Sequence, residues 1–241
     1  MKGIDEIRHL LGQLDDSISR FPSEKVFQTI RMEIACGLLK PRERLIENDL
    51  CKRFDTSNHN IRQAFELLDR IALIDRRPNR GVEVKLLSRD ELKDLCDVCV
   101  LLQIASALRI DPSRTTELAN KLETINSQYV AAIQVGSLAE AVVANDAFHI
   151  ATFDYCLNKD LAALQLTYWL KASAVISHAL LDEHTRSRTL ETHEEIIAAI
   201  RAGDLNRFSE IAVDHIQPAV ESYDRLHLLS DLNAPGEDMG A

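Results

Sequence analysis

Hydrophobic residues recur at helical spacing along most of the chain, and only one short region has the pattern of strands. Between residues 23 and 68, three apolar stripes predict three helices. Ser23 is expected to cap the first of them, and Gly37 lies near its end. The stripes consist of Val26, Ile30, Ile34 and Leu38 in the first helix, Ile46, Leu50 and Phe54 in the second, and Ile61, Ala64, Phe65 and Leu68 in the third.

A short connection and a β-hairpin complete this region. Asp55-Thr56-Ser57 interrupts the apolar spacing, and Ser57 is placed to cap the helix that follows. Two β-prone runs, 72–74 and 81–84, then flank a turn over residues 78–81. Helices and hairpin in this order predict a winged helix-turn-helix domain over residues 23–87.

Polar side chains on the third helix are the first sign of function. Its apolar stripe leaves Asn58, His59, Arg62, Gln63 and Glu66 facing outward, and several of these suit base edges or phosphates in a DNA major groove. An exposed polar helix is often no more than a solvated face. Here a partner helix, a capped turn and a basic hairpin accompany it, which favours DNA binding.

The tip of the predicted hairpin is basic. Arg76, Arg77 and Arg80 surround the turn that Gly81 closes. Such a wing is expected to contact phosphate or the minor groove.

From Ser88 onward the strand signals end and six helices are predicted, approximately over 88–110, 113–135, 137–157, 159–182, 185–202 and 204–229. Helices of this length joined by short turns pack as antiparallel neighbours. The expected fold is therefore mainly α: a winged helix-turn-helix domain with a small β-hairpin wing, followed by an all-α antiparallel bundle over residues 88–229.

The two ends of the chain have different patterns. Residues 1–22 contain apolar positions at helical spacing, which predicts an amphipathic N-terminal arm that either packs against a partner subunit or frays. Residues 230–241 have no apolar periodicity and are expected to form a disordered tail.

The balance of basic and acidic residues changes at the same boundary as the hydrophobic pattern. The chain has a formal net charge of −10, but residues 23–86 contain 13 Lys and Arg against 10 Asp and Glu, whereas residues 87–241 contain 12 against 24. The first domain is thus mildly basic, as DNA binding requires, and the bundle is acidic. No apolar run approaches the roughly 18 to 20 residues of a membrane helix. The acidic N-terminus does not resemble a signal peptide, so a cytoplasmic protein is expected.

Cysteines and histidines are the remaining candidates for chemistry. Five cysteines are scattered through helical stretches, and the pair Cys96 and Cys99 is expected to be core packing rather than a metal or redox motif. His149, His193 and His215 lie on three different predicted helices, with Asn145 one helical turn before His149. Facing helices can build a metal site from such residues. Taken singly, each histidine is more often a core or surface residue, and chain spacing does not show that the three converge.

These features together resemble the GntR family of bacterial transcription regulators, in its FadR-type branch with a helical FCD ligand domain. The resemblance covers about residues 23–225 and rests on three segments: 67–84 (LLDRIALIDRRPNRGVEV), Phe148-His149, and 193–204 (HEEIIAAIRAGD) followed by His215. Six helices after the winged domain resemble the VanR-like subgroup.

The resemblance implies a homodimer whose winged domains bind a palindromic operator, as a repressor or activator. It also implies a bundle that binds a small effector, such as an organic acid, beside a divalent metal such as zinc or nickel. The DNA contacts would be Ser57, Asn58, His59, Arg62, Arg77, Arg80 and Gly81. The metal ligands would be Asn145, His149, His193 and His215, with Asp146 as a substitute.

The sequence departs from the family pattern at three places. Asn145 occupies a position where the family has Asp, so the metal has less charge stabilisation. Cys99 and Gln103, expected in the effector pocket, replace a common Arg and Glu, which weakens the case for a simple carboxylate effector. Asn58 replaces the arginine that usually contacts guanine, and asparagine suits adenine better.

Two alternatives remain open at this stage. A site with three histidines could activate water in a metal-dependent enzyme, although no nucleophile or general base accompanies it. A regulator with weakened sequence-specific DNA binding could instead act through protein partners.

Overall fold

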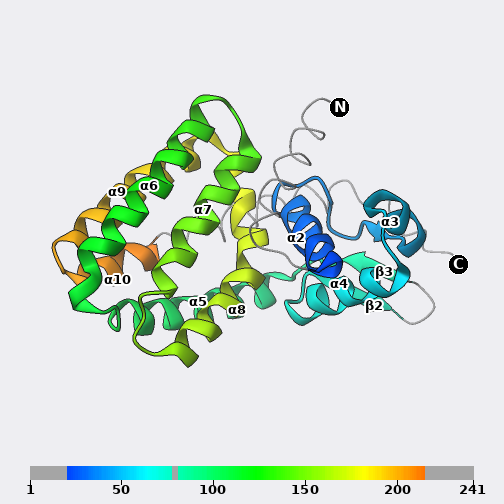
Figure 1. Ribbon diagram of the computed structural model, residues 1–241, viewed down its shortest axis with the longest axis horizontal. Helices are drawn as coiled ribbons and strands as arrows, with labels where there is room; N and C mark the ends of the chain where they lie inside the picture. Colours follow the sequence, from blue (N-terminus) through cyan, green and yellow to red (C-terminus); the bar gives the residue numbers. More distant parts are fainter. Residues whose placement is uncertain (1–20, 78–80, 215–241) are drawn as a thin grey trace, which may run out of the picture.

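The computed structural model describes residues 21–77 and 81–214 and consists of two lobes (Figure 1). Residues 1–20 of the predicted N-terminal arm, the wing tip, His215 and the C-terminal tail lie outside these ranges. The winged lobe is formed by the N-terminal part of the chain, and α5 leads from it into a lobe made of helices alone. The mainly α fold expected from the sequence is confirmed.

The winged lobe has three helices and a small antiparallel sheet with strand order β1-β3-β2. Arg77 pairs with Gly81 at the end of the hairpin, and β1, which the sequence pattern did not predict, pairs Leu45 with Val82. The elements are α2 (Pro22–Ala35), β1 (Arg44–Leu45), α3 (Glu47–Phe54), α4 (Asn58–Arg70), β2 (Ile74–Arg77) and β3 (Gly81–Val84).

Local chemistry decides where these helices begin. Ser57 is the N-cap of α4, and its hydroxyl accepts from the Asn60 N–H at 3.4 Å, as expected. Ser23 does not cap α2, so that prediction was wrong: the helix begins one residue earlier, at Pro22, with Phe21 as its N-cap. Proline is well suited to the first helical position because its φ is already helical and no N–H is needed there.

Within the described residues, the second lobe contains six α-helices at the predicted places. The first four are shorter than predicted, and the prediction for the last helix extends past Asp214, outside the described ranges. Two 3₁₀ turns, η1 (Pro112–Arg114) and η2 (Ser177–Leu181), occupy the ends of what the sequence predicted as continuous helix. The helices are α5 (Arg89–Ala107), α6 (Thr115–Gln134), α7 (Leu138–Phe153), α8 (Lys159–Ile176), α9 (Glu183–Arg201) and α10 (Leu205–Asp214). Within the described ranges, none of the helices is long and apolar enough to cross a membrane.

Helix pairing places the centre of the bundle between α6, α7, α9 and α10. There α6 packs on α7 and α9, while α10 packs on α9 and α5, and α5 also packs on α8. Phe148, Ile196 and Phe208 are fully buried in the apolar cluster that these helices share. The winged lobe has its own core around Phe65, and this core continues into the bundle through Tyr129 and Val142.

The two lobes are also joined by a buried ion pair. Arg31 on α2 donates to Asp146 on α7 at 2.8 Å and to the Ser173 hydroxyl on α8 at 3.0 Å. The Trp169 indole N–H donates to the second carboxylate oxygen of Asp146 at 3.2 Å. Every member of this network is buried, so the position of α2 on the bundle is fixed by directional contacts.

Candidate DNA-binding surface and effector site

The N-terminal turn of α4 presents a polar surface to solvent. Asn58, His59, Arg62 and Gln63 are all exposed, while Ile61 and Phe65 are buried beneath them. No acidic residue lies in this first turn. The exposed N–H groups and positive dipole end of the helix therefore favour contact with phosphate.

Two of these side chains are already oriented by neighbours. The Cys51 thiol on α3 donates to the Asn58 amide oxygen at 3.1 Å. Arg62 donates to Glu47 at 3.0 Å, and both side chains are at least one-third exposed. An exposed ion pair contributes little to stability, so Arg62 can exchange this carboxylate for a phosphate or a base.

The pairing of β2 with β3 forms the base of the wing. Gly81 begins β3 with a φ of +84°, a left-handed conformation that glycine adopts without strain. No atom of the described residues lies within 4 Å of where its Cβ would be. The backbone of Arg77 pairs with Gly81, whereas Arg80 lies outside the described ranges.

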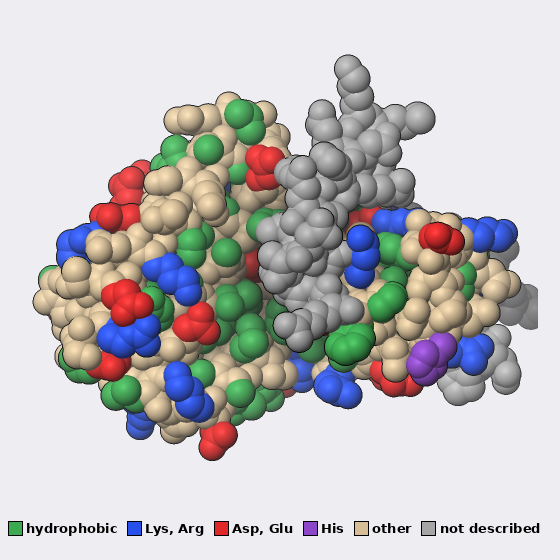
Figure 2. All heavy atoms as spheres, viewed as in Figure 1, with side chains coloured by type: hydrophobic (Ala, Val, Ile, Leu, Met, Phe, Trp, Pro, Cys, Tyr) green, Lys and Arg blue, Asp and Glu red, His purple; other side chains and the backbone are tan. Residues whose placement is uncertain are grey.

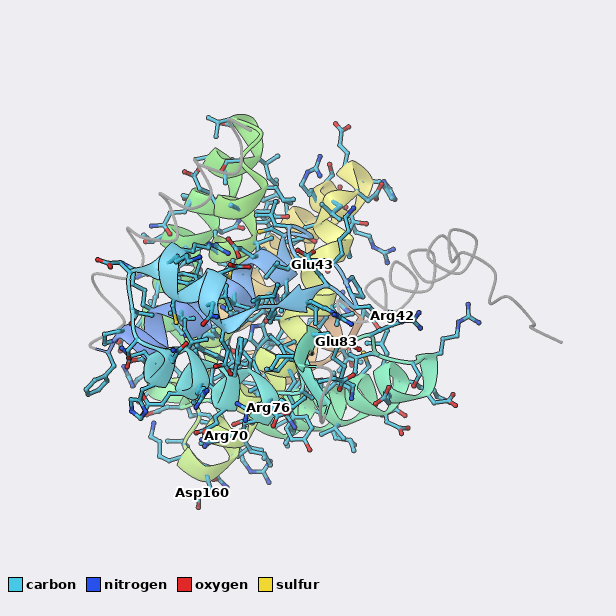
Figure 3. All side chains as sticks on the ribbon, turned by 90° about the vertical axis from the view of Figure 1, so that its right-hand side faces the viewer. Arg42, Glu43, Arg70, Arg76, Glu83 and Asp160 are labelled. Atoms are coloured by element: carbon cyan, nitrogen blue, oxygen red, sulfur yellow. The ribbon has the colours of Figure 1, made fainter. Side chains whose placement is uncertain are left out.

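Two further basic residues on this lobe, Arg42 and Arg70, were missed by the sequence analysis, whereas Arg76 was already expected beside the turn. Figure 3 views the molecule from the winged end, where Arg42, Arg70 and Arg76 are exposed. Arg76 donates to the backbone carbonyl of Arg62 at 3.3 Å, which links the strand to the recognition helix. Glu43 and Glu83 are labelled at the same end, so the basic surface is interrupted. Arg42 lies before a two-residue strand, and a strand that short leaves no periodic signal.

In the bundle, the structure brings two of the predicted metal ligands together. His149 on α7 and His193 on α9 have ring centres 5.5 Å apart. Two imidazoles on one tetrahedral ion place their ring centres about 5 Å apart, because each Zn–N bond is about 2 Å long. The pair therefore has the spacing of two ligands of one metal. His215 lies outside the described residues.

Neighbouring residues fix the orientation of His193. Its Nδ1 lies 3.0 Å from the Asn126 amide oxygen, which can only accept, so Nδ1 is the donor. In the neutral ring this leaves the lone pair on Nε2. The ring also stacks on Phe148, with centroids 3.8 Å apart. A hydrogen bond of this kind on the far nitrogen is how proteins orient a metal-ligating histidine.

Asn145 and Asp146 point to different environments. The Asn145 amide oxygen is buried and has no hydrogen-bond partner among the described residues, and Asn145 also lines a pocket in the bundle. Both carboxylate oxygens of Asp146 instead contact Arg31 and Trp169. The prediction that Asp146 substitutes as a metal ligand therefore does not fit the structure. Within the described ranges, no group of three His, Cys, Asp or Glu side chains could hold a metal, so a complete site requires the amide and His215.

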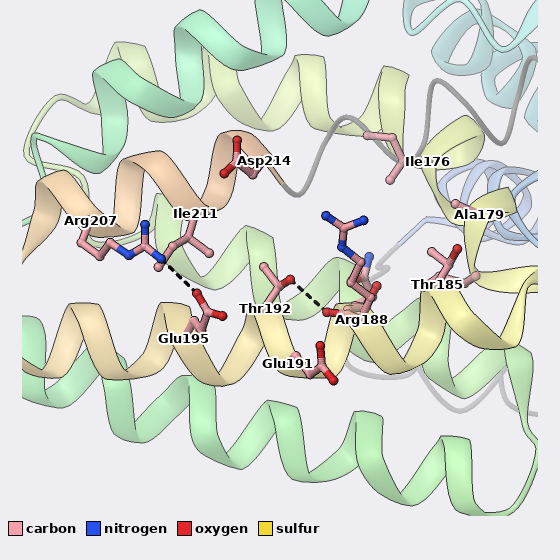
Figure 4. Close-up of a pocket in the computed structure, with 13 residues that line it drawn as sticks. Ile176, Ala179, Thr185, Arg188, Glu191, Thr192, Glu195, Arg207, Ile211 and Asp214 are labelled. Atoms are coloured by element: carbon pink, nitrogen blue, oxygen red, sulfur yellow. Dashed lines mark hydrogen bonds and ion pairs between the residues drawn. The ribbon is translucent and has the colours of Figure 1, made fainter.

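The pocket beside Asn145 has a volume of about 200 Å³ and lies between η2, α9 and α10. Figure 4 shows Arg188 and Thr192 projecting into it from α9, with Arg207 and Asp214 on α10. Arg207 pairs with Glu195 at 3.2 Å, whereas Arg188 has no acidic partner among the described residues. The sequence analysis missed Arg188. Thr189 also lines the pocket and lies one helical turn before His193. Helical spacing from His193 could therefore have indicated that this part of α9, with the adjacent Arg188, faces the pocket.

Cys99 and Gln103 were predicted to line the effector pocket, but they surround a separate space of about 10 Å³. A space of that size holds about one water molecule. The Gln165 amide donates to the Gln103 amide oxygen at 2.7 Å across it. Cys96 and Cys99 are buried against α8, as predicted, and burial raises the pKa of the Cys99 thiol to about 12. A thiol with so high a pKa is a poor metal ligand and a poor nucleophile.

Taken together, the two lobes define a class of protein: a winged DNA-binding domain joined to a helical domain with an internal polar pocket. Residues 22–84 match the bacterial regulatory proteins of the gntR family, and residues 94–218 match the FCD domain. The chain belongs to the GntR family and is a transcription regulator with an FCD ligand-binding domain.

Known relatives agree with this assignment. The HTH-type transcriptional repressor RspR of Escherichia coli K12 is 25% identical over 206 residues, which cover 83% of this chain and 88% of that protein. A GntR regulator from Rhodococcus sp. RHA1 has 21% identity and a TM-score of 0.68, with 84% of this chain and 97% of that one covered. McbR/YncC of E. coli has 15% identity and a TM-score of 0.73, with coverages of 87% and 100%. The matching families and the repressor RspR are transcription regulators, not enzymes.

Proposed function

We propose that the protein is a homodimer that binds a palindromic operator and changes its operator affinity when a small effector enters the bundle. The observation that supports this best is the exposed, acid-free first turn of α4 on a winged domain. Asn58, His59 and Arg62 contact bases or phosphates from this turn, and Ser57 holds its backbone in place. Arg77, Arg80 and Gly81 place the wing against the adjacent groove.

An exposed apolar stripe supports the homodimer. Leu101 and Ile104 lie on one face of α5, and Leu108, the C-cap of this helix, follows them at helical spacing. Their exposed fractions are 67%, 37% and 45%. Leu157 adjoins this stripe, because its N–H donates to the Arg109 carbonyl at 2.8 Å. Large apolar side chains gathered on one surface favour burial against another protein, and we assign this face to a second copy of the chain.

The effector site is the pocket beside Asn145. Asn145, His149, His193 and His215 would hold a divalent ion such as zinc or nickel, which would supply a Lewis-acidic anchor for an oxygen of the effector. Arg188 provides a cation for an anionic group, so an organic acid fits the site even though α5 lacks the usual arginine.

The path from this pocket to the winged domain is short. Asn145, which lines the pocket, is followed directly by Asp146, which holds Arg31 of α2. An effector that shifts α7 therefore acts on the contact that positions the winged domain. Differential binding to two domain orientations with a coupling energy of about 1–3 kcal/mol would be enough for regulation.

DNA binding is tested first by fluorescence anisotropy with the DNA immediately upstream of the protein's own gene and a scrambled fragment of equal length. We expect the native fragment to bind roughly 1000-fold more tightly or better at physiological salt, as specific recognition does. Arg62→Ala should abolish this preference without unfolding the protein. Arg201→Ala, which removes the same charge from an exposed position on α9, should not. If both fragments bind weakly and alike, the alternative of a regulator acting through protein partners is favoured instead.

Sequence preference at residue 58 is tested by selecting bound sequences from a random pool. Asn58 should select adenine, because its amide can bond to N6 and N7 together. Asn58→Arg should change the selected base at that position to guanine and leave the other positions unchanged. A strong guanine selected by the natural protein would contradict the assignment.

A further inference from the structure

A second and larger cavity lies between the two lobes, outside the pocket assigned to the effector. Its volume is about 470 Å³, within the range of small-molecule sites. One wall is α2 of the winged domain, and the others are α6, α7 and α8 of the bundle. Figure 2 shows hydrophobic side chains gathered on the bundle lobe beside the winged lobe. The apolar lining includes Met32, Ile125, Val143, Ala147, Ile150 and Leu170.

The charged groups in its walls are already paired with one another. Arg31 bonds to Asp146 at 2.8 Å, and Lys121 bonds to Asp154 at 3.3 Å. The Gln28 amide oxygen accepts from Arg31 Nε at 3.2 Å. A charged ligand would therefore lose its hydration without gaining a counter-ion, which is costly in an apolar site.

We propose that this interdomain pocket binds an uncharged, largely apolar small molecule. Such a ligand contacts α2 and α7 at once, beside the Arg31 and Asp146 pair that joins them. The binding energy of the ligand depends on the position of the winged domain on the bundle. The ligand therefore favours one relative orientation of the two domains. The protein would thus have two ligand sites: a polar site inside the bundle and an apolar site between the domains.

The test uses Nile red, an uncharged dye that fluoresces in apolar surroundings, titrated into the full-length protein without DNA. We expect saturable binding of one dye per chain. Ala147→Phe should weaken it roughly tenfold or more, because a filled cavity leaves no room for the rings of the dye. Thr29→Phe fills the same space from α2 and should act alike, which keeps the test decisive if one variant does not fold. Ala198→Phe, the same kind of change at an exposed position on α9, should bind as the natural protein does.

Several outcomes would overturn the proposal. Equal dye binding by the natural protein and both filled variants would place the dye elsewhere. Dye binding that appears only after deletion of residues 1–20 would identify that segment as the occupant, and binding that falls as the chain dimerises would identify a second copy. Tighter Ala147-sensitive binding of the anionic dye 8-anilinonaphthalene-1-sulfonate would contradict the uncharged ligand class. None of these measurements involves DNA, so failure here leaves the operator-binding proposal intact.

Discussion

At the scale of single residues, Arg31 has the largest expected effect on stability. Its guanidinium is buried and holds Asp146 at 2.8 Å. Arg31→Met leaves that carboxylate buried with the Trp169 indole as its remaining described donor. We expect a loss of about 3–5 kcal/mol in the free energy of unfolding, because removing one partner leaves an uncompensated buried charge. Urea denaturation followed by circular dichroism measures this loss.

The double variant Arg31→Met with Asp146→Leu is the matched control. Replacing both members of a buried ion pair by apolar residues is often neutral or stabilising. We therefore expect it to recover most of the stability that the single variant loses. A double variant as unstable as the single one would show that packing of the arginine side chain, rather than the unpaired charge, was responsible.

At the scale of elements, two residues beside β2 and β3 have a left-handed backbone, and only one of them is a glycine. Ala72 joins α4 to β2 with a φ of 56°, whereas Gly81 begins β3 with a φ of 84°. A side chain in this region costs roughly 1–2 kcal/mol, partly offset by the greater unfolded-state freedom of glycine. Ala72→Gly should therefore stabilise the protein by about 0.5–1 kcal/mol and Gly81→Ala should destabilise it similarly. Shifts of the urea midpoint in the same direction for both variants would contradict this explanation.

The elements also show what the sequence could predict. Apolar spacing located the helices because each buries one face, and Ser57 located the start of α4 through its own hydrogen bond. The strand run predicted at 72–74 begins only at Ile74, since the left-handed Ala72 still belongs to the turn. β1 was missed because two residues cannot show a period of two.

The candidate site was predictable only in part, for a related reason. His149 and His193 do approach each other, but their convergence depends on the packing of α6 between α7 and α9, which chain spacing does not specify. The packing of α5 on α8 places Cys99 and Gln103 around a different, smaller space. Arg188 lies in the pocket beside Asn145, between α9 and α10, where no motif had indicated it.

At the scale of the whole molecule, operator recognition depends on how two chains associate. The stripe formed by Leu101, Ile104 and Leu108 should be buried in the homodimer. Leu101→Glu places a charge at the most exposed position of this stripe, and we expect the variant to sediment as a monomer, because burying an unpaired carboxylate is costly. Analytical ultracentrifugation at micromolar concentration measures the association.

The same variant links association to function. A monomer binds a single half-site, so its affinity for a palindromic operator should fall by orders of magnitude, while its affinity for an isolated half-site should match that of the natural protein. Val135→Glu is the matched control, because Val135, the C-cap of α6, is an apolar residue that is 74% exposed and distant in sequence from the stripe. It should remain dimeric and bind the full operator normally. If Leu101→Glu remains dimeric, the dimer uses another face. If the variant is monomeric yet binds the full operator normally, the two half-sites are recognised independently, and the winged domains need no fixed spacing.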